Sequence, residues 1–330
     1  MLSALKDIIS GSSNLDALNY VRLADGHAYG TDLTRWATVP FPLAAGLAPC
    51  CVPYKNLSAF LDRAGDTPPK FKQESNILRV SAGKMRASLP VLPPDALPAL
   101  DHLREGTRLT MKTADLAGVI HAMANETTRP ALKGVSIRRG LIEATDGHRI
   151  ARRPVDGAEE MGIILPDSFA KLLAALAGDV VILTTDERTV TWEQPGGITV
   201  TSKLVDGKFP DTQNHWPASQ PRKASWPRAE LEAAIRTAAL SENYSHAVSF
   251  RGASGQMVIS GSGGNGLEFT YECAYSGDEM AFDMDVRYVL DMIAAHPGET
   301  ISATFDGPGG PFLFCGDELV MPLRIKPSGG

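Results

Sequence analysis

Residues 166–179 read Pro-Asp-Ser-Phe-Ala-Lys-Leu-Leu-Ala-Ala-Leu-Ala-Gly-Asp, and this stretch decides the fold because the chain repeats it. Residues 53–66, 113 positions earlier, also run from Pro to Gly-Asp without a gap. Residues 285–299, which begin 119 positions later, form a third copy that is one residue longer. Proline at the start and glycine at the end are typical of a helix. The three stretches therefore predict three related helices.

Two further patterns recur at nearly the same spacing. Residues 113–120 match residues 228–235, 115 positions later, and residues 3–9 are a candidate first copy. The pair Thr31-Asp32 recurs as Thr145-Asp146, 114 positions later. Such a period exceeds the roughly 20–50 residues of a solenoid unit and is the size of a whole domain. The alternative is that short amphipathic helices resemble one another by chance. Three repeated patterns with the same period make this alternative less favoured.

Short apolar runs between these helices predict strands, because each is rich in β-branched or aromatic residues and is bounded by turn residues. The runs are residues 134–137, 179–183, 197–200, 256–260, 267–271 and 300–305. We therefore expect an α+β fold of three tandem homologous domains, each with two helices on one side of antiparallel sheets. The expected domains are residues 1–103, 104–220 and 221–330, with boundaries near residues 98–105 and 218–224.

Composition excludes several classes of protein. The 330 residues are 43% hydrophobic, which is too apolar for a disordered chain. Lys and Arg total 32 against 38 Asp and Glu, and the net charge of −6 argues against a protein that coats nucleic acid by bulk charge. No run approaches the roughly 20 apolar residues of a membrane helix. The N-terminus does not resemble a signal peptide, and the four cysteines form no CxxC, so we expect a cytoplasmic protein without a membrane partner.

One motif looks reactive, namely Asp146-Gly147-His148-Arg149. A hydrolytic site at Asp146 and His148 is one hypothesis, but the chain has no HExxH or HxH, and Asp-Gly after a strand favours a turn. The glycine-rich residues 261–266 precede a strand rather than a helix, so they favour a hairpin connection over a phosphate loop. Residues 307–310 are interpreted in the same way. We expect a non-enzyme without cofactor or metal.

Four stretches then point to a family. They are residues 201–211 (Thr-Ser-Lys-Leu-Val-Asp-Gly-Lys-Phe-Pro-Asp), 142–151, 274–280 and 320–325. In this order they resemble the signature of the bacterial sliding clamps, the DNA polymerase III beta subunit. The resemblance covers essentially the whole chain and is strongest from Thr113 onward.

The resemblance implies a homodimer with a defined task. Two chains of three domains would join head to tail as a ring around duplex DNA, with helices lining the hole and antiparallel sheets outside. Contacts to DNA would be independent of its sequence, and the ring would slide. The implied partners are duplex DNA, a DNA polymerase and the clamp loader, and the two proteins would bind through short peptide motifs. The chain would confer processivity on the polymerase.

The resemblance also implies three sets of site residues. The apolar members of the pocket would form an adaptable floor, and Arg149 and Arg324 would offer polar contacts at its rim. The peptide pocket between domains 2 and 3 would comprise Leu132, Thr145, Gly147, His148, Arg149, Ile150, Pro210, Asn214, His215, Tyr288, Val320, Met321, Pro322, Leu323 and Arg324. The DNA-facing residues would be Arg129, Lys203 and Arg236, and the dimer contact would comprise Ala87, Leu89, Ala239 and Leu240.

Departures from the family pattern support an alternative. The chain begins at the first helix, so domain 1 is expected to lack the usual first strand, and Ala87 replaces a larger apolar residue. Pro130-Ala131 replaces residues that face DNA in many relatives, while Asn214 and His215 alter one pocket wall. The alternative is a clamp-fold decoy or interaction module, which binds clamp-binding peptides or a clamp protomer without encircling DNA.

Overall fold

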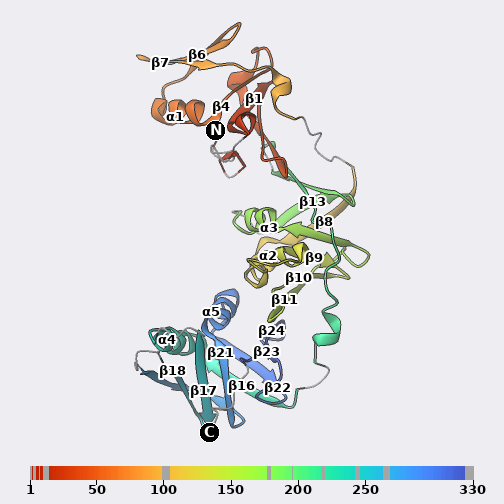
Figure 1. Cartoon of the computed structure of the whole chain (residues 1–330), viewed down its shortest axis with the longest axis vertical. Coiled ribbons are helices and arrows are strands. Elements are labelled where there is room, and N and C mark those ends of the chain that lie inside the picture. Colours follow the sequence, from red (N-terminus) through yellow and green to blue (C-terminus); the bar gives the residue numbers. More distant parts are fainter. Residues whose placement is uncertain are drawn as a thin grey trace. The chain divides into compact units, whose positions relative to one another are not determined.

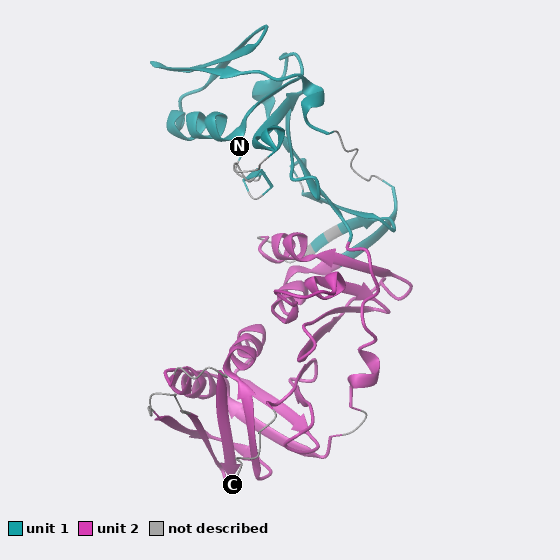
Figure 2. Cartoon of the chain, in the orientation of Figure 1, with its two compact units in different colours: residues 1–110, 181–204 teal, residues 111–180, 205–330 magenta. Residues whose placement is uncertain are grey.

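The computed structural model describes residues 2, 5–6, 8–9, 15–98, 105–176, 180–194, 196–217, 220–241, 246–262 and 268–323. The chain divides into two compact units (Figure 2). The first unit comprises Met1–Thr110 and Val181–Leu204, and the second comprises Met111–Val180 and Val205–Gly330. The chain therefore leaves the first unit, returns to it once, and ends in the second.

The first unit contains an eight-stranded sheet in the order β4-β1-β2-β3-β15-β14-β13-β8 (Figure 1). Its strands are β1 (Tyr20–Ala24), β2 (His27–Thr31), β3 (Arg35–Pro40), β4 (Cys50–Pro53), β8 (Thr107–Lys112), β13 (Val180–Thr185), β14 (Thr189–Gln194) and β15 (Ile198–Lys203). Helix α1 (Tyr54–Ala64) starts directly after Pro53 and buries Tyr54, Leu57 and Ala64. Gly65, at φ +54°, ends the helix in a conformation that glycine adopts readily.

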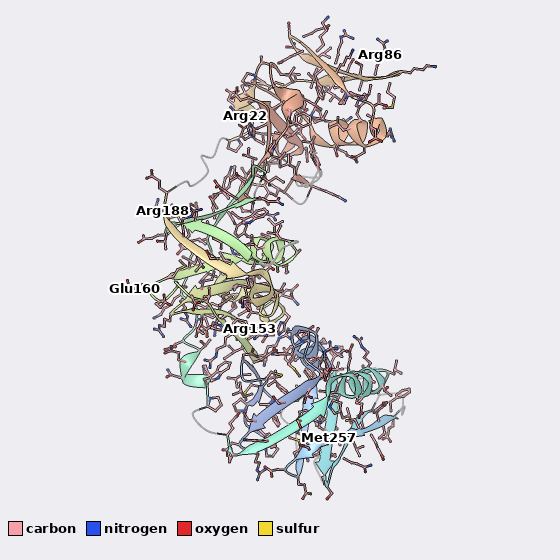
Figure 3. All side chains as sticks on the ribbon, turned by 180° about the vertical axis from the view of Figure 1, so that it is seen from behind. Arg22, Arg86, Arg153, Glu160, Arg188 and Met257 are labelled. Carbon is pink, nitrogen blue, oxygen red and sulfur yellow. The ribbon has the colours of Figure 1, made fainter. Side chains whose placement is uncertain are left out.

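A second, smaller sheet of this unit consists of β5 (Lys70–Glu74), β6 (Ile77–Ala82) and β7 (Met85–Pro90). Strand β6 alternates between exposed and buried residues, because only one face of the sheet packs on the core. The exposed face carries Lys70, Lys72, Arg79 and Arg86, and Figure 3 shows Arg86 at the outer edge of this sheet. Short 3-10 turns η2 (Asp16–Asn19), η3 (Pro42–Ala44) and η4 (Pro94–Ala96) connect the strands of the unit.

The second unit is built on a nine-stranded sheet in the order β12-β9-β10-β11-β24-β23-β22-β16-β20. Its strands are β9 (Gly134–Arg138), β10 (Leu141–Thr145), β11 (Arg149–Pro154), β12 (Gly162–Pro166), β16 (Arg222–Pro227), β20 (Ser276–Gly277), β22 (Thr300–Phe305), β23 (Phe312–Phe314) and β24 (Glu318–Val320). Pairing of β11 with β24 places Arg149 opposite Val320. Residues more than 160 positions apart therefore become neighbours at this junction.

Helices cover this unit in pairs. Helix α2 (Thr113–Ala117) packs against α3 (Asp167–Ala174), and α4 (Arg228–Ala239) packs against α5 (Val286–Ala295) (Figure 1). A four-stranded sheet in the order β19-β18-β17-β21 adjoins α4, with strands β17 (Ala247–Ala253), β18 (Gln256–Ser262), β19 (Glu268–Ala274) and β21 (Met280–Asp285). The core between these elements is rich in aromatic rings, and the rings of Phe282 and Phe312 lie 4.2 Å apart. The connecting turns are η5 (Ile120–Ala122), η6 (Pro130–Lys133) and η7 (Gln213–His215).

The structure confirms the predicted elements that it describes. The five described helices start in the predicted stretches, although α4 extends four residues beyond its repeat to Ala239 and α3 ends at Ala174. Residues 177–179 of the α3 repeat lie outside the described residues. Each predicted strand is present, and residues 307–310 connect the paired strands β22 and β23. Strands β18 and β19 form the hairpin expected around residues 261–266, of which residues 263–266 lie outside the described part. Of residues 3–9, the described Leu5, Ile8 and Ile9 are buried.

The division into three domains stays a prediction. The two boundaries were expected near residues 98–105 and 218–224, and of these residues 99–104 and 218–219 lie outside the described residues. Within the described residues, no helix is long and apolar enough to cross a membrane.

Candidate functional site

The turn between β10 and β11 is held together by side chains of its own residues. The Thr145 hydroxyl donates to the Arg149 carbonyl at 2.6 Å and accepts from the Gly147 amide at 3.1 Å. One carboxylate oxygen of Asp146 accepts from the amides of His148 and Arg149, at 2.9 and 3.1 Å. Gly147 has φ +94°, a conformation that favours glycine. The prediction of a turn at Asp146-Gly147 is confirmed.

The guanidinium group of Arg149 connects this turn to helix α5. Its Nε donates to Asp146 at 3.0 Å, its Nη1 donates to Asp291 at 2.7 Å, and its Nη2 donates to the carbonyl of His121. The Tyr288 ring centroid lies 4.4 Å from the guanidinium carbon, and Arg149 is only 7% exposed. Three of the five guanidinium N–H groups are thus committed to the protein. Arg149 holds the turn and α5 together, and two N–H groups remain as candidates for a ligand.

Helix α5 and strand β24 form a second wall beside the turn. The ring of His148 stacks on that of Tyr288, with centroids 6.3 Å apart and an interplanar angle of 25°. Burial is the largest cause that raises the pKa of the Tyr288 phenol, and the nearby charge of Asp146 adds to it. The Met321 amide, just after β24, donates to the His148 carbonyl at 3.0 Å. The turn, the helix and the strand end therefore meet at one place.

The residues that follow strand β15 in the chain form a third wall. Buried polar side chains hold this segment in place. The Arg138 guanidinium donates to the carbonyl of Pro210 at 2.5 Å and to Glu143 at 3.3 Å. The Thr212 hydroxyl donates to the other oxygen of Glu143 at 2.6 Å. Glu143 is only 2% exposed, and a buried carboxylate that loses its partners costs several kcal/mol. The position of Pro210 is therefore determined by strands β9 and β10.

The same wall is attached again beyond η7, which contains Asn214 and His215. Trp216 follows η7, and the guanidinium carbon of Arg152 on β11 lies 3.4 Å from the centroid of its ring. Contacts between an arginine and an indole face are favourable, by about 0.5–2 kcal/mol. The backbone of Asn214 and His215 is thus held on one side by the Pro210 contact and on the other by the Trp216 contact. Their own side chains stay exposed.

These walls surround a cavity of about 620 Å³, which lies in the range of ligand-binding pockets. Its floor is apolar, with Leu132, Ile150 and Leu319 buried. Met321 is 42% exposed, and no carboxylate is present among the described residues that line the cavity. The lining residues are Arg129, Leu132, Thr145, Gly147, His148, Arg149, Ile150, Pro210, Thr212, Asn214, His215, Pro311, Leu319 and Met321.

Ten of the fifteen residues predicted for the peptide pocket line this cavity. Tyr288 and Val320 instead support it, through the contacts of Tyr288 with His148 and Arg149 and the pairing of Val320 with Arg149. Pro322 and Leu323 are not among the lining residues, and Arg324 lies outside the described residues. That the cavity binds peptides stays a prediction.

Sequence reasoning missed three lining residues, which are Thr212, Pro311 and Leu319. Thr212 follows the quoted motif directly and could have been found by extending it by one residue. Leu319 precedes the predicted Val320 in an apolar strand, but only the β11–β24 register places it at the cavity floor. No signal in the sequence points to Pro311.

The three residues that were predicted to face DNA lie in different surroundings. Arg129, predicted to face DNA, is among the residues that line the cavity. Arg236 is paired with Glu232 at 2.8 Å, and the Lys203 ammonium lies 5.3 Å from the Trp36 ring centroid. Contacts of these three residues with DNA stay a prediction.

The predicted dimer contact combines two different surfaces. On strand β7, Leu89 is buried and Ala87 is half-buried. At the end of α4, Ala239 is half-buried, whereas Leu240 is 60% exposed. The contact itself stays a prediction.

The site shows no arrangement for hydrolysis. Both carboxylate oxygens of Asp146 accept hydrogen bonds within the turn, and the His148 ring stacks on a tyrosine. Among the described residues, no group of three or more His, Cys, Asp or Glu side chains could hold a metal ion. The geometry is that of a binding surface.

Paired helices on antiparallel sheets, with a ligand-sized cavity in the second unit, are the arrangement of the DNA clamp fold. The fold matches a DNA polymerase sliding clamp of Pseudomonas aeruginosa with a TM-score of 0.85, at 24% identity, over 98% of this chain and 97% of that one. It matches the Bacillus subtilis sliding clamp with a TM-score of 0.86, at 20% identity, over 98% of this chain and 96% of that one.

The sequence comparisons agree with the fold. The family described as "DNA polymerase III beta subunit, central domain" matches residues 110–211. The beta sliding clamp of Caulobacter vibrioides is 27% identical over 294 residues, which are 80% of this chain and 78% of that protein. That of Pseudomonas putida is 28% identical over 281 residues, 77% of this chain and 76% of that protein. The sequence and the fold of this chain are thus both similar to those of the bacterial beta sliding clamps, at a sequence identity of 27–28%.

Proposed function

We propose that this chain is a sliding clamp, which forms a head-to-tail homodimeric ring around duplex DNA and tethers a polymerase to it. The observation that carries the proposal is the cavity, because ten residues from four separate stretches of the sequence line it together. Its ligands are short peptides of the polymerase and of the clamp loader. In this proposal the chain has three domains, residues 1–103, 104–220 and 221–330, and works in the cytoplasm.

The chemistry of the cavity supports a peptide ligand of defined character. The floor of Leu132, Ile150 and Leu319 suits large apolar side chains, which supply most of the affinity of a short peptide. The exposed rim carries Arg129, His148 and His215 without an opposing carboxylate among the lining residues. A peptide with two or three apolar side chains and one acidic side chain matches this surface.

Two edge strands of opposite charge support the dimer. Strand β7 lies at the edge of its sheet and exposes Arg86, next to Lys84 in the preceding turn. Strand β19 lies at the edge of another sheet and exposes Glu268 and Glu272. Unpaired edge strands readily add a further strand, and complementary charge selects the partner. One β7–β19 contact in each direction closes a ring of two chains.

The helices support weak contacts with DNA. On α4, Arg228 and Arg236 both pair with Glu232, at 3.5 and 2.8 Å. These pairs lower the net positive charge of the helix, so a duplex inside the ring would be held loosely and could slide. A net charge of −6 is compatible with such a ring.

The alternative is a clamp-fold module that binds peptides or a clamp protomer without encircling DNA. The observation that favours it is Ala87 at the predicted contact, because a small side chain on β7 buries little apolar surface against a partner.

Two exposed residues separate the parts of the proposal. Met321→Asp places a charge at the cavity and should abolish binding of a fluorescein-labelled Ala-Leu-Asp-Leu-Phe peptide, measured by anisotropy, while the dimer persists. Leu240→Asp should weaken the dimer in light scattering, together with retention on nicked circular DNA, while peptide binding persists. Each variant serves as the control for the other.

The results also decide between the two functions. A parent protein that stimulates a processivity assay is a clamp, whereas the alternative module would inhibit it. A protein that remains monomeric at micromolar concentration and is not retained on circular DNA contradicts the ring.

A further inference from the structure

Ionisable side chains gather where the C-terminal end of α5 meets β11 and β24. They come from η5, β11, α5 and the start of β24, and all lie in the second unit. His296 follows α5 and is 11% exposed in its side chain, and Glu318 in β24 is fully buried. The cluster comprises His121, Arg153, His296, Asp317 and Glu318.

The ring of His296 faces hydrogen-bond acceptors on both sides. Its Nδ1 lies 2.8 Å from the carbonyl oxygen of Met292, which can only accept, so Nδ1 carries a proton. Its Nε2 lies 2.7 Å from a carboxylate oxygen of Asp317, which accepts as well when ionised. Both nitrogens therefore carry protons in this geometry, and the ring is an imidazolium cation.

A neutral ring would find a different partner. Without its proton, Nε2 would point a lone pair at the Asp317 carboxylate, which is unfavourable at 2.7 Å. The Arg153 guanidinium lies 3.3 Å from the same Nε2 and can donate to it. Arg153 also holds the second oxygen of Asp317 at 2.8 Å. Loss of the proton thus removes the His296–Asp317 bond, frees one oxygen of Asp317, and leaves Nε2 to accept from Arg153, which already lies 3.3 Å away.

The surroundings of His296 include charges of both signs. Asp317 and Glu318 face its ring from β24 and the residue before it, with Glu318 at 3.9 Å from Nδ1, and Arg153 faces it from β11. Arg228 of α4 donates to the His296 backbone carbonyl at 3.2 Å. His121 of η5 lies on the far oxygen of Glu318, at 2.9 Å.

These neighbours favour the cation on balance. Burial by itself lowers the pKa of His296, but the hydrogen bonds to Asp317 and Met292 and the charges of Asp317 and Glu318 outweigh it. The net result is a pKa raised above the ordinary 6.5. The position just after α5 acts in the same direction, because the C-terminal end of a helix favours a cation.

The bond from His296 to Asp317 is one of three contacts that link α5, β11 and β24 beside the cavity. Strand β11 pairs with β24, and Arg149 at the start of β11 bonds Asp291 of α5. The His296–Asp317 bond is the third contact, and it links the end of α5 to the start of β24. Helix α5 carries the Tyr288 ring behind His148, and β24 leads to Leu319 and Met321 in the cavity. Figure 3 marks Arg153 at this junction.

We propose that His296 is a positioning residue of the cavity, whose protonated ring ties α5 to β24 and thereby makes ligand affinity depend on pH. The inference rests on the peptide-binding function proposed above and concerns the regulation of that site. In the protonated state the wall formed by α5 and the floor residue Leu319 keep the spacing seen here. In the neutral state the bond from His296 to Asp317 is lost, although Arg153 still holds the second oxygen of Asp317, and the cavity loses this spacing.

The direction of the pH effect follows from the raised pKa. A histidine with a folded-state pKa above its unfolded value stabilises the fold fully below about pH 6.5. This contribution disappears as the pH rises through the folded-state pKa. Stability and ligand affinity should therefore both fall as the pH rises from about 6.5 through the raised folded-state pKa.

The experiment compares parent protein, His296→Gln and His27→Gln between pH 6 and pH 9. The probe is a fluorescein-labelled Ala-Leu-Asn-Leu-Phe peptide, which is neutral at its central position and so removes the charge effect of the rim histidines. For the parent and for His27→Gln, in which a histidine of the first unit is changed, we expect the Kd to rise about fivefold. For His296→Gln we expect a constant Kd, since the amide can still donate to Asp317 but does not titrate.

A second variant and a second measurement keep the test decisive. Asp317→Asn removes the carboxylate that favours the cation, so the midpoint of the pH profile should move to lower pH. Thermal unfolding of each protein over the same pH range should show a decline for the parent that His296→Gln lacks.

The outcomes separate the inference from the function. A flat profile for the parent, or an unchanged slope in His296→Gln, overturns the role of His296. Absence of peptide binding to every variant, with the difference in thermal stability intact, overturns the peptide-binding function and leaves the His296 contact supported.

Discussion

Two turns of this molecule, one in each compact unit, share a sequence pattern and differ in their surroundings. In the first unit the Thr31 hydroxyl donates to the Arg35 carbonyl at 2.8 Å, and Asp32 accepts from two amides of its turn. In the second unit Thr145, Asp146 and Arg149 make the same set of bonds. The repeated Thr-Asp pair thus encodes the same local structure twice.

The difference lies beyond the turn. Arg35 donates its Nε to Asp32 at 2.9 Å, just as Arg149 does to Asp146 at 3.0 Å. Arg149 also reaches Asp291, the carbonyl of His121 and the Tyr288 ring, which come from other elements. The same local pattern therefore acts as a hairpin turn in one unit and as part of a cavity wall in the other.

The largest expected effect on stability comes from replacing the arginine of each turn by alanine. Arg149→Ala should destabilise the second unit by about 3 kcal/mol, because it removes a buried guanidinium group that bonds Asp146, Asp291 and the His121 carbonyl. Arg35→Ala should cost about 2 kcal/mol, since it removes the charge-assisted bond from Arg35 to Asp32. Urea unfolding followed for each unit measures both values, and equal costs would contradict the difference drawn between the turns.

A smaller effect is expected at the residue with a left-handed backbone in each turn. Gly147 has φ +94° and Leu33 has φ +73°. Gly147→Ala should cost about 1 kcal/mol through backbone strain alone, because no atom lies within 4 Å of the added methyl group. Leu33→Gly should be nearly neutral, since relief of strain offsets the greater entropy of the unfolded chain. A loss of stability in Leu33→Gly similar to that of Gly147→Ala would show that the Leu33 side chain matters.

The smallest effect concerns acid stability of the first unit. Burial alone raises the pKa of Asp32, but hydrogen bonds from Thr34 and Arg35 outweigh it, and the net pKa lies below 3.8. Asp32 therefore stabilises the folded state above pH 3.8, and this contribution disappears as the pH falls through the lowered value. Asp32→Asn should flatten the decline of thermal stability below pH 4, measured by circular dichroism. A parent and variant with parallel acid profiles would contradict this contribution.

Much of the fold could be predicted from local patterns. Proline before and apolar spacing within residues 53–66 and 166–179 indicated α1 and α3, and β-branched runs such as residues 300–305 indicated strands. These signals are local, so one sequence contains them. The position of Arg129 in the cavity and the bonds of Arg149 to Asp291 and His121 could not be predicted, because burial and partners depend on which distant strands pair.

The amino-acid sequence by itself determined the elements, their period of about 115 residues and the turn chemistry of Thr145 and Asp146, since these depend on neighbours within a few positions. Only the tertiary structure decided which residues form the cavity. The register of β11 with β24 brings Leu319 beside Ile150 and sets His296 against Asp317. Such contacts join residues more than a hundred positions apart or on different elements, and they follow from packing the whole chain rather than from any one stretch.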